Sequence, residues 1–335
     1  MRAPCASTIP PAAASGRSRP RRRRTWQAPA RPSPGTIARN RVDSRASSPA
    51  QSAQPSSQPS PRSPSQPSSQ SRDASLPVVT GPRWTGVHYF CTTRAGGVGI
   101  APHDTLNLGL RAGDRPEAVE ENRRRVRAML PADPLWLRQV HGTRVVDADG
   151  PADETAPGTA EGEPAADAAV TIAVDRPLAI MVADCLPVLI ADTGGRALGA
   201  AHAGWRGLAG GVLENTLDAL RRKCPAASAW QAWIGPGIGP AAFEVGADVL
   251  DAFDRADREA AALFTPRPGL PGKWLADLPA LAELRLRRAG VAQVHRSGLC
   301  TVSDARRFFS YRRDGQTGRM ALLAWLSARP FEYPH

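Results

Sequence analysis

The chain has 335 residues, enough for one large domain or two of ordinary size, so core size is not limiting. The formal net charge is +12, but residues 1–75 contain 13 arginines and no lysine against only Asp43 and Asp73, and so carry +11 of it. The remainder is nearly neutral, with 30 basic and 29 acidic side chains. This distribution argues against nucleic acid as a partner outside the basic N-terminal segment.

Residues 1–78 form an extension rich in Arg, Ser and Pro, with almost no large apolar side chains. Such a segment cannot bury enough surface to offset the entropy of ordering, so we expect it to be disordered. Its composition fits an arm that binds nucleic acid or a membrane surface, or an organelle transit peptide. The alternative is a segment without function: a dispensable extension, or translated upstream sequence from a misassigned start. We favour the last interpretation, because no amphipathic helical pattern accompanies the arginines.

Membrane insertion and disulfide bonding are not indicated. No stretch approaches the ~20 uninterrupted apolar residues that cross a bilayer. The five cysteines are odd in number and widely spaced, unlike a disulfide framework. We therefore expect a cytoplasmic protein without a membrane partner.

Strand and helix patterns alternate unevenly beyond the extension, without an internal repeat. In chain order they predict a strand over 86–94, a helix over 115–130, one or two strands over 135–148, a mobile acidic loop over 149–166, and four buried strands over 168–174, 178–184, 187–193 and 197–204. A helix over 208–223, a strand over 229–239, helices over 245–253 and 275–290, a strand over 291–298 and a β-hairpin over 308–326 complete the prediction. The fold class is therefore α/β, a sandwich-like single domain with a mixed sheet over residues 79–335.

Three side chains that could bind a metal each follow a buried-strand pattern. His141 lies in "LRQVHG", Cys185 ends "IMVADC" and His202 lies in "AAHAG". Strand ends can deliver side chains from a rigid scaffold to one site. Two imidazoles and one thiolate suit Zn²⁺ and leave its fourth tetrahedral position open, as catalytic sites require. The spacings of 44 and 17 residues alone leave open that all three are buried core side chains.

Several long motifs occur in an order that resembles the laccase-domain family of YfiH type, formerly described as multicopper polyphenol oxidoreductases and later reassigned as purine nucleoside phosphorylases. They include "TTRAGGVG", "WLRQVHG", "ADCLPVLIAD", "AAHAGWRGLAGGV" and "FFSYRRDGQTGRMA". The resemblance spans about residues 83–326. It implies phosphorolysis of adenosine, inosine, guanosine and S-methyl-5′-thioadenosine, with adenosine deamination as a second activity. It also implies His141, Cys185 and His202 as ligands of Zn²⁺, with Cu²⁺ as the alternative metal.

Further site residues are expected near these ligands. Arg94 and Arg206 flank glycine-rich turns and are candidates for binding phosphate, with a surface position as the alternative. Asn107 is a candidate for contact with the nucleoside or an ordinary turn residue. Asp184 is either a support for the metal site or a residue of a strand-end turn. Cys185, Asp184 and Arg206 are the candidate catalytic residues, and no general acid is assigned.

Several alternatives stay open at this point. A copper-dependent polyphenol oxidase is disfavoured, because a multicopper site requires many more imidazoles than the chain can supply. Beyond the three proposed ligands, the remaining histidines are His88, His103, His295 and His335.

A non-catalytic module for envelope quality control or ligand binding is the other alternative. Arg312 and Arg313 fit a solvated hairpin better than a pocket, and both a monomer and a homodimer are compatible with the sequence.

Overall fold

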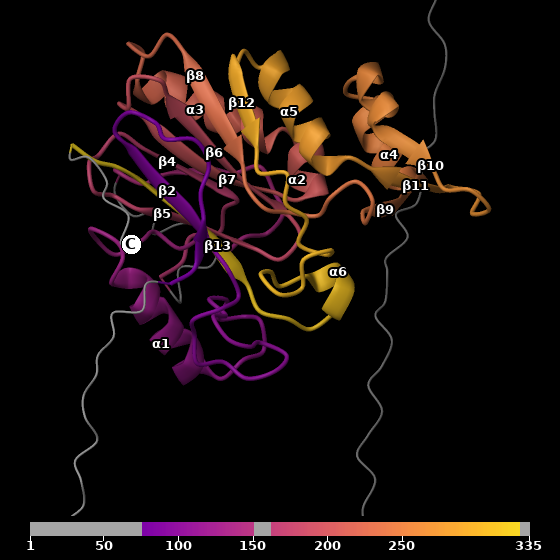
Figure 1. The fold of residues 1–335 in the computed structure, drawn as a ribbon. Coiled ribbons are helices and arrows are strands. Elements are labelled where there is room, and N and C mark those ends of the chain that lie inside the picture. The colour runs from indigo at the N-terminus through magenta and orange to yellow at the C-terminus, as the bar shows by residue number, and fades with distance from the viewer. Residues whose placement is uncertain (1–75, 151–161, 329–335) are drawn as a thin grey trace, which may run out of the picture. The chain divides into compact units, whose positions relative to one another are not determined.

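A computed structural model describes residues 76–150 and 162–328 (Figure 1). The expected disorder of residues 1–75 and the expected mobility of most of the acidic loop fall outside these ranges. Residues 76–78, which we had expected within the extension, belong to the described structure, since Val78 and Val79 form β1. Within the described ranges, no helix has the length and apolar character needed to cross a membrane.

A six-stranded mixed sheet contributes two of the three expected metal ligands. Its strand order is β12, β8, β6, β7, β4, β3. The pairs β6–β7, β6–β8 and β4–β7 are antiparallel, whereas β3–β4 and β8–β12 are parallel. Its strands are β3 (Val145–Asp147), β4 (Ala168–Thr171), β6 (Leu186–Asp192), β7 (Leu198–Ala203), β8 (Trp230–Ile234) and β12 (Gln293–Arg296).

A second, four-stranded antiparallel sheet packs against the first. Its order is β1, β2, β13, β5. One shared core joins Tyr89, Ile180 and Leu322 of this sheet to Leu189 and Ala200 of the six-stranded sheet. The predicted sandwich is therefore confirmed. The strands of the second sheet are β1 (Val78–Val79), β2 (Val87–Thr92), β5 (Leu178–Val182) and β13 (Met320–Leu326).

Helices cover the outer faces of both sheets (Figure 1). Helix α1 (Pro116–Arg127) packs on the outer face of the four-stranded sheet, where Val126 shares a core with Phe90 and Leu323. Their neighbours Tyr89 and Leu322 point to the opposite, inner face. On the other side, α3 (Val212–Lys223) and α5 (Leu278–Arg288) pack on the six-stranded sheet. Because both faces are covered, the central strands read as continuous apolar runs instead of alternating ones.

The predicted helix over 208–223 is interrupted. The structure has α2 (Trp205–Gly210) and then α3, with Gly211 between them. Gly211 has φ 97°, a left-handed conformation that glycine adopts without the steric cost of a Cβ atom. The apolar spacing predicted the buried face correctly, but it did not show the break that redirects the chain after the "HAGWRG" motif.

The predicted hairpin over 308–326 is wrong. Residues Tyr311–Asp314 form a short helix, α6, in which the Ser310 hydroxyl accepts a hydrogen bond from the Arg313 backbone N–H at 3.2 Å. The strand β13 that follows pairs with β2 and β5, which are distant in sequence. Serine at the helix N-cap satisfies an otherwise unpaired donor, and this local bond favours a helical turn over a strand.

Two further differences concern short strands. The expected strands over 135–148 reduce to β3, with isolated bridges at Leu135 and Arg138. A third, antiparallel sheet was not predicted, because its strands are only three or four residues long. The elements of this region are β9 (Glu244–Gly246), α4 (Ala247–Asp254), the 3₁₀ helix η2 (Arg258–Leu263), β10 (Phe264–Pro266) and β11 (Lys273–Ala276).

Candidate functional site

Antiparallel pairing of β6 and β7 brings two of the expected ligands together. Leu186, the first residue of β6, lies opposite Ala203, the last residue of β7. Cys185 immediately precedes Leu186, and His202 immediately precedes Ala203, so their positions converge at the same end of the strand pair. His202 therefore lies within β7 instead of after a strand, whereas Cys185 lies in the turn that follows β5.

The third candidate ligand, His141, lies in a loop that Asp167 holds in place. The Asp167 carboxylate accepts hydrogen bonds from the backbone N–H groups of His141 at 2.8 Å and Gly142 at 2.7 Å. His141 has φ 59°, a left-handed conformation that is uncommon outside glycine, and these bonds stabilise it. Asp167 directly precedes β4, which pairs with β7, so the same carboxylate also reaches Nδ1 of His202 at 2.8 Å.

The donor atoms of His141, Cys185 and His202 are close enough together that they could hold one metal ion. All lie within 4.8 Å of one another, and Sγ of Cys185 is 3.8 Å from Nε2 of His141. Tetrahedral zinc, with bonds of about 2.3 Å to sulfur and about 2.0 Å to nitrogen, requires a separation of about 3.5 Å between such atoms. Because Asp167 occupies Nδ1 of His202, Nε2 is the nitrogen left for the metal.

The electrostatic environment favours the metal-binding form of Cys185. Burial raises the pKa of the thiol, but the charge of His202 and hydrogen bonds from His141 and His202 outweigh it and lower the pKa to about 6. Burial likewise opposes protonation of His202, yet the Cys185 thiolate and Asp167 raise the pKa of its imidazole. The thiolate, which is the ligand form of cysteine, is therefore accessible near neutral pH.

Gly204 provides the space that the three ligands occupy. A Cβ atom at this position would lie 2.9 Å from Cδ2 of His141 and 3.0 Å from Sγ of Cys185. Its φ of −68° is compatible with alanine, so the crowding is the main cost of a methyl group. We expect Gly204→Ala to weaken zinc binding by about tenfold or more, comparable to losing a residue that supports a ligand.

Competition with a chromogenic chelator measures this effect on the folded protein. Gly150→Ala is the matched control, because its Cβ atom would come no closer than 3.6 Å to another residue. An unchanged zinc affinity in Gly204→Ala would contradict the ligand assignment.

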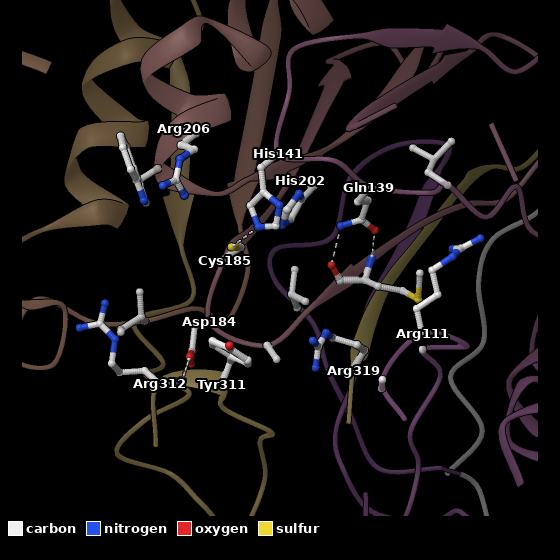
Figure 2. Close-up of a pocket in the computed structure, with 18 of the residues that line it drawn as sticks. Arg111, Gln139, His141, Asp184, Cys185, His202, Arg206, Tyr311, Arg312 and Arg319 are labelled. Atoms are coloured by element: carbon white, nitrogen blue, oxygen red, sulfur yellow. Dashed lines mark hydrogen bonds between the residues drawn. The ribbon is translucent and has the colours of Figure 1, made fainter. Parts of the chain in front are cut away.

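A cavity of about 580 Å³ opens over these three residues (Figure 2). Its volume lies within the range of about 300–1,000 Å³ that is typical of small-molecule sites. One part of its lining is apolar and aromatic, with Trp205, Ile238 and Phe243. Several guanidinium groups complete the wall, so the cavity suits a ligand that combines a flat ring with negative charge. The lining arginines are Arg111, Arg138, Arg206, Arg312 and Arg319.

Residues 88–327 match the family described as multi-copper polyphenol oxidoreductase laccase. The chain belongs to this family. It is 49% identical over 235 residues to a protein of Pseudomonas aeruginosa named purine nucleoside phosphorylase, covering 70% of this chain and 91% of that one. It is 44% identical over 250 residues to the purine nucleoside phosphorylase YfiH of Escherichia coli, covering 73% and 97%. A solved structure of a Neisseria meningitidis protein is 46% identical, with a TM-score of 0.67 over 76% of this chain and 99% of that one.

Asp184, one of the family-motif residues, is engaged within the protein. Its side chain is buried, and it accepts hydrogen bonds from the Thr301 hydroxyl and the Arg312 backbone N–H, both at 2.6 Å. Asp184 has φ 100°, which these contacts help to stabilise. The residue therefore connects the turn that carries Cys185 to the start of α6.

Arg206 and Arg94 occupy different environments. Arg206 lines the cavity, where its guanidinium stacks on the Trp205 ring at 4.4 Å. Arg94 is not among the lining residues. Its guanidinium forms an ion pair with Asp104 at 3.1 Å and donates to the Ala305 carbonyl at 3.0 Å. The structure thus brings Arg206, and not Arg94, to the candidate metal ligands.

Asn107 is fully buried beside the cavity and does not line it. Its Oδ1 accepts hydrogen bonds from the backbone N–H groups of Gly109 at 3.0 Å and Arg319 at 2.8 Å. Its amide N–H donates to Asp114 at 3.1 Å. These bonds occupy the polar atoms that a nucleoside would need, so Asn107 shapes the wall instead of facing the cavity.

Sequence reasoning missed other residues of the site. Arg312 was expected to be a solvent-exposed residue of a hairpin, but it lines the cavity. Arg313 instead donates hydrogen bonds to the carbonyls of Thr301 and Val302. Gln139 was not selected, although it belongs to the "QVHG" motif. Its amide pairs with both backbone groups of Met181 at 2.8 Å, as a neighbouring strand would (Figure 2). The signal that could have identified Gln139 and Arg312 is that both are polar residues within the family motifs.

Proposed function

We propose that this protein is a zinc-dependent purine nucleoside phosphorylase. Its substrates would be adenosine, inosine, guanosine and S-methyl-5′-thioadenosine together with phosphate, and adenosine deamination would be a second activity. The observation that carries the proposal is the high identity to relatives named purine nucleoside phosphorylase, of which the Pseudomonas and Escherichia proteins are covered over 91% and 97% of their lengths.

The donor set supports the metal in this proposal. His141, Cys185 and His202 would hold the ion, and Asp167 would orient His202. Bound zinc supplies Lewis acidity and lowers the pKa of a coordinated water to near 7. Copper also accepts two imidazoles and one thiolate, so Cu²⁺ remains the alternative ion.

Phosphorolysis makes one bond and breaks one at the ribose. A phosphate oxygen bonds to C1′ while the bond between C1′ and the purine nitrogen breaks, and the purine leaves with the electron pair and takes up a proton. Positive charge develops on the ribose, and an anchored phosphate stabilises it.

Arg206 and Trp205 would contact the nucleoside. Asp184, with both carboxylate oxygens engaged, would position Cys185 and Arg312. In deamination, water would add to purine C6 and ammonia would leave.

The copper-oxidase function in the family's description has less support. Within residues 76–150 and 162–328, a single group of three or more His, Cys, Asp or Glu side chains can hold a metal. A multicopper oxidase needs a further cluster with many imidazoles. One three-ligand centre with an aromatic and cationic cavity fits nucleoside chemistry better.

Metal analysis combined with a nucleoside assay tests the proposal. Purified full-length protein should contain about one zinc per chain and release hypoxanthine from inosine only when phosphate is present. Chromatography of the products, with adenosine run in parallel, distinguishes phosphorolysis from deamination. Absence of any product with all four nucleosides, at full zinc occupancy, would contradict the enzymatic function and favour a ligand-binding module.

A further inference from the structure

Arg319 differs from the other arginines near the candidate metal ligands. It is half-buried, lines the cavity, and lies across the three ligands from Arg206 (Figure 2). Its Nη1 donates to the carbonyls of Thr317 at 2.8 Å and Gly318 at 3.1 Å. Nε and Nη2 have no hydrogen-bond or ion-pair partner in the part of the chain that the structure describes. One edge of this guanidinium is thus available to a ligand.

The available edge is the one that binds oxyanions elsewhere in this chain. Arg196 grips the carboxylate of Asp192 through Nε at 2.6 Å and Nη2 at 3.1 Å. The same two donors of Arg319 have no such partner among residues 76–150 and 162–328. Two parallel N–H donors match the spacing of two oxygens of a carboxylate or a phosphate.

No carboxylate neutralises Arg319 within the described residues. The charge of Asp184 acts on Arg319, but both oxygens of this carboxylate already accept hydrogen bonds from Thr301 and Arg312. Burial lowers the pKa of the Arg319 guanidinium. The negative charges of Cys185 and Asp184 act in the opposite direction and raise it. A half-buried cation without a paired anion is unfavourable, so a bound anion would stabilise this position.

The backbone of Arg319 is fixed before any ligand arrives. Its N–H donates to Asn107 Oδ1 at 2.8 Å, and its carbonyl accepts from the Leu108 N–H at 3.0 Å. The residue also directly precedes β13, which is paired on both sides. Pre-organised donors lose little entropy when they bind, which favours affinity for a small anion.

Three other arginines of this region, Arg94, Arg111 and Arg206, differ from Arg319. Arg94 is ion-paired with Asp104, and Arg111 with Glu163 at 2.9 Å. Arg206 is exposed and stacks on Trp205, on the aromatic side of the cavity. Among these four residues, Arg319 alone combines partial burial, a fixed backbone, a position in the cavity wall and two donors without a partner in the described part of the chain.

We propose that Arg319 is the phosphate anchor of this site, with Asn107 as the residue that positions it. This inference rests on the proposed phosphorylase function and names a phosphate residue that sequence reasoning did not select. Nε and Nη2 bind two phosphate oxygens, and a third oxygen forms the new bond to C1′ as the purine leaves. The resulting ribose 1-phosphate keeps its phosphate on Arg319. The nucleoside enters from the side of Trp205.

Steady-state kinetics of inosine phosphorolysis test the anchor, with phosphate and inosine varied separately. Arg319→Gln should raise the KM for phosphate by about 10- to 100-fold, as expected for a lost charged hydrogen bond, and change the KM for inosine less than about twofold. Arg206→Gln tests the other phosphate candidate of the cavity: it should leave the KM for phosphate within about twofold and instead raise the KM for inosine. Arg319→Lys retains the charge without the two-donor edge, and should also raise the KM for phosphate.

A binding measurement separates this inference from the enzymatic function. Inorganic phosphate should raise the Tm of the wild-type protein, and the shift should vanish in Arg319→Gln while persisting in Arg206→Gln. If the wild type releases no hypoxanthine but shows this pattern, the phosphorylase function fails and the anion site stands. Equal phosphate shifts in the wild type and Arg319→Gln, or a phosphate effect lost only in Arg206→Gln, would overturn the assignment. If Arg319→Gln does not fold, Arg319→Lys takes its place: a phosphate-induced Tm shift smaller than that of the wild type supports the assignment, and an equal shift overturns it.

Discussion

Replacing Cys185 with alanine is expected to remove bound zinc and nearly all phosphorolysis. The thiolate is one of three donors within 4.8 Å of one another, and the remaining two imidazoles form a much weaker site. We expect zinc content to fall from about one per chain to below a tenth, and kcat/KM for inosine to fall by about a hundredfold or more, beyond the loss typical of residues that support a ligand. Elemental analysis and product chromatography measure both effects.

Loss of the fold is not the expected cause of this change. Cys185 is half-buried in a turn, and removing one sulfur atom there should cost about 1 kcal/mol or less of unfolding free energy. Cys224→Ala is the matched control, since Cys224 ends α3, outside the cavity. Full activity in a folded, zinc-free Cys185→Ala protein would contradict zinc dependence, and full zinc content would contradict the ligand assignment.

The sequence located the three candidate ligands, but their position alone did not identify them as ligands. Cys185 directly precedes the apolar run that forms β6, and His202 lies inside the run that forms β7. His141 was also selected by its position after a strand pattern, and only the order of the family motifs favoured metal binding over three core side chains. Local sequence patterns do not show which strands pair. The antiparallel register that places Leu186 opposite Ala203, and so brings Cys185 close to His202, is visible only in the folded sheet.

The supporting residues could not be predicted for the same reason. Asp167 precedes β4, and its contact with His202 depends on the pairing of Ala168 with Ala201 across β4 and β7. Arg319 faces the cavity because β13 joins β2 and β5 instead of forming a local hairpin. Each of these side chains acts through a partner that is far away in the sequence.

The phosphate candidates illustrate how a local motif can mislead. Arg94 precedes a glycine-rich turn, which is a common setting for anion binding. Its guanidinium is instead satisfied by Asp104, ten residues along the chain, and stacks on Phe309 at 4.7 Å. A positive side chain is available to a ligand only when the fold leaves it without an internal acceptor, and sequence does not state which acceptors are near.

Asp167→Asn is expected to weaken zinc binding by about 10- to 100-fold, because residues that orient a ligating histidine contribute to metal affinity on this scale. Asp167 is fully buried and accepts hydrogen bonds from backbone N–H groups of Val140, His141 and Gly142 as well as from Nδ1 of His202. Asparagine has one acceptor oxygen, so its amide N–H₂ must face at least one of these donors. We also expect a loss of about 2–4 kcal/mol in unfolding free energy.

The two effects are separated by measuring zinc affinity on folded protein, with a chelator and well below the Tm, and stability by urea unfolding. Asp192→Asn is the control for stability alone: its carboxylate is equally buried at the far end of β6 and binds Arg196. That variant should lose stability and retain wild-type zinc affinity. If Asp167→Asn behaved in the same way, Asp167 would be a structural residue only. A loss of zinc affinity that Asp192→Asn does not share would instead show that the Asp167 carboxylate, beyond its contribution to stability, orients His141 and His202 for the metal.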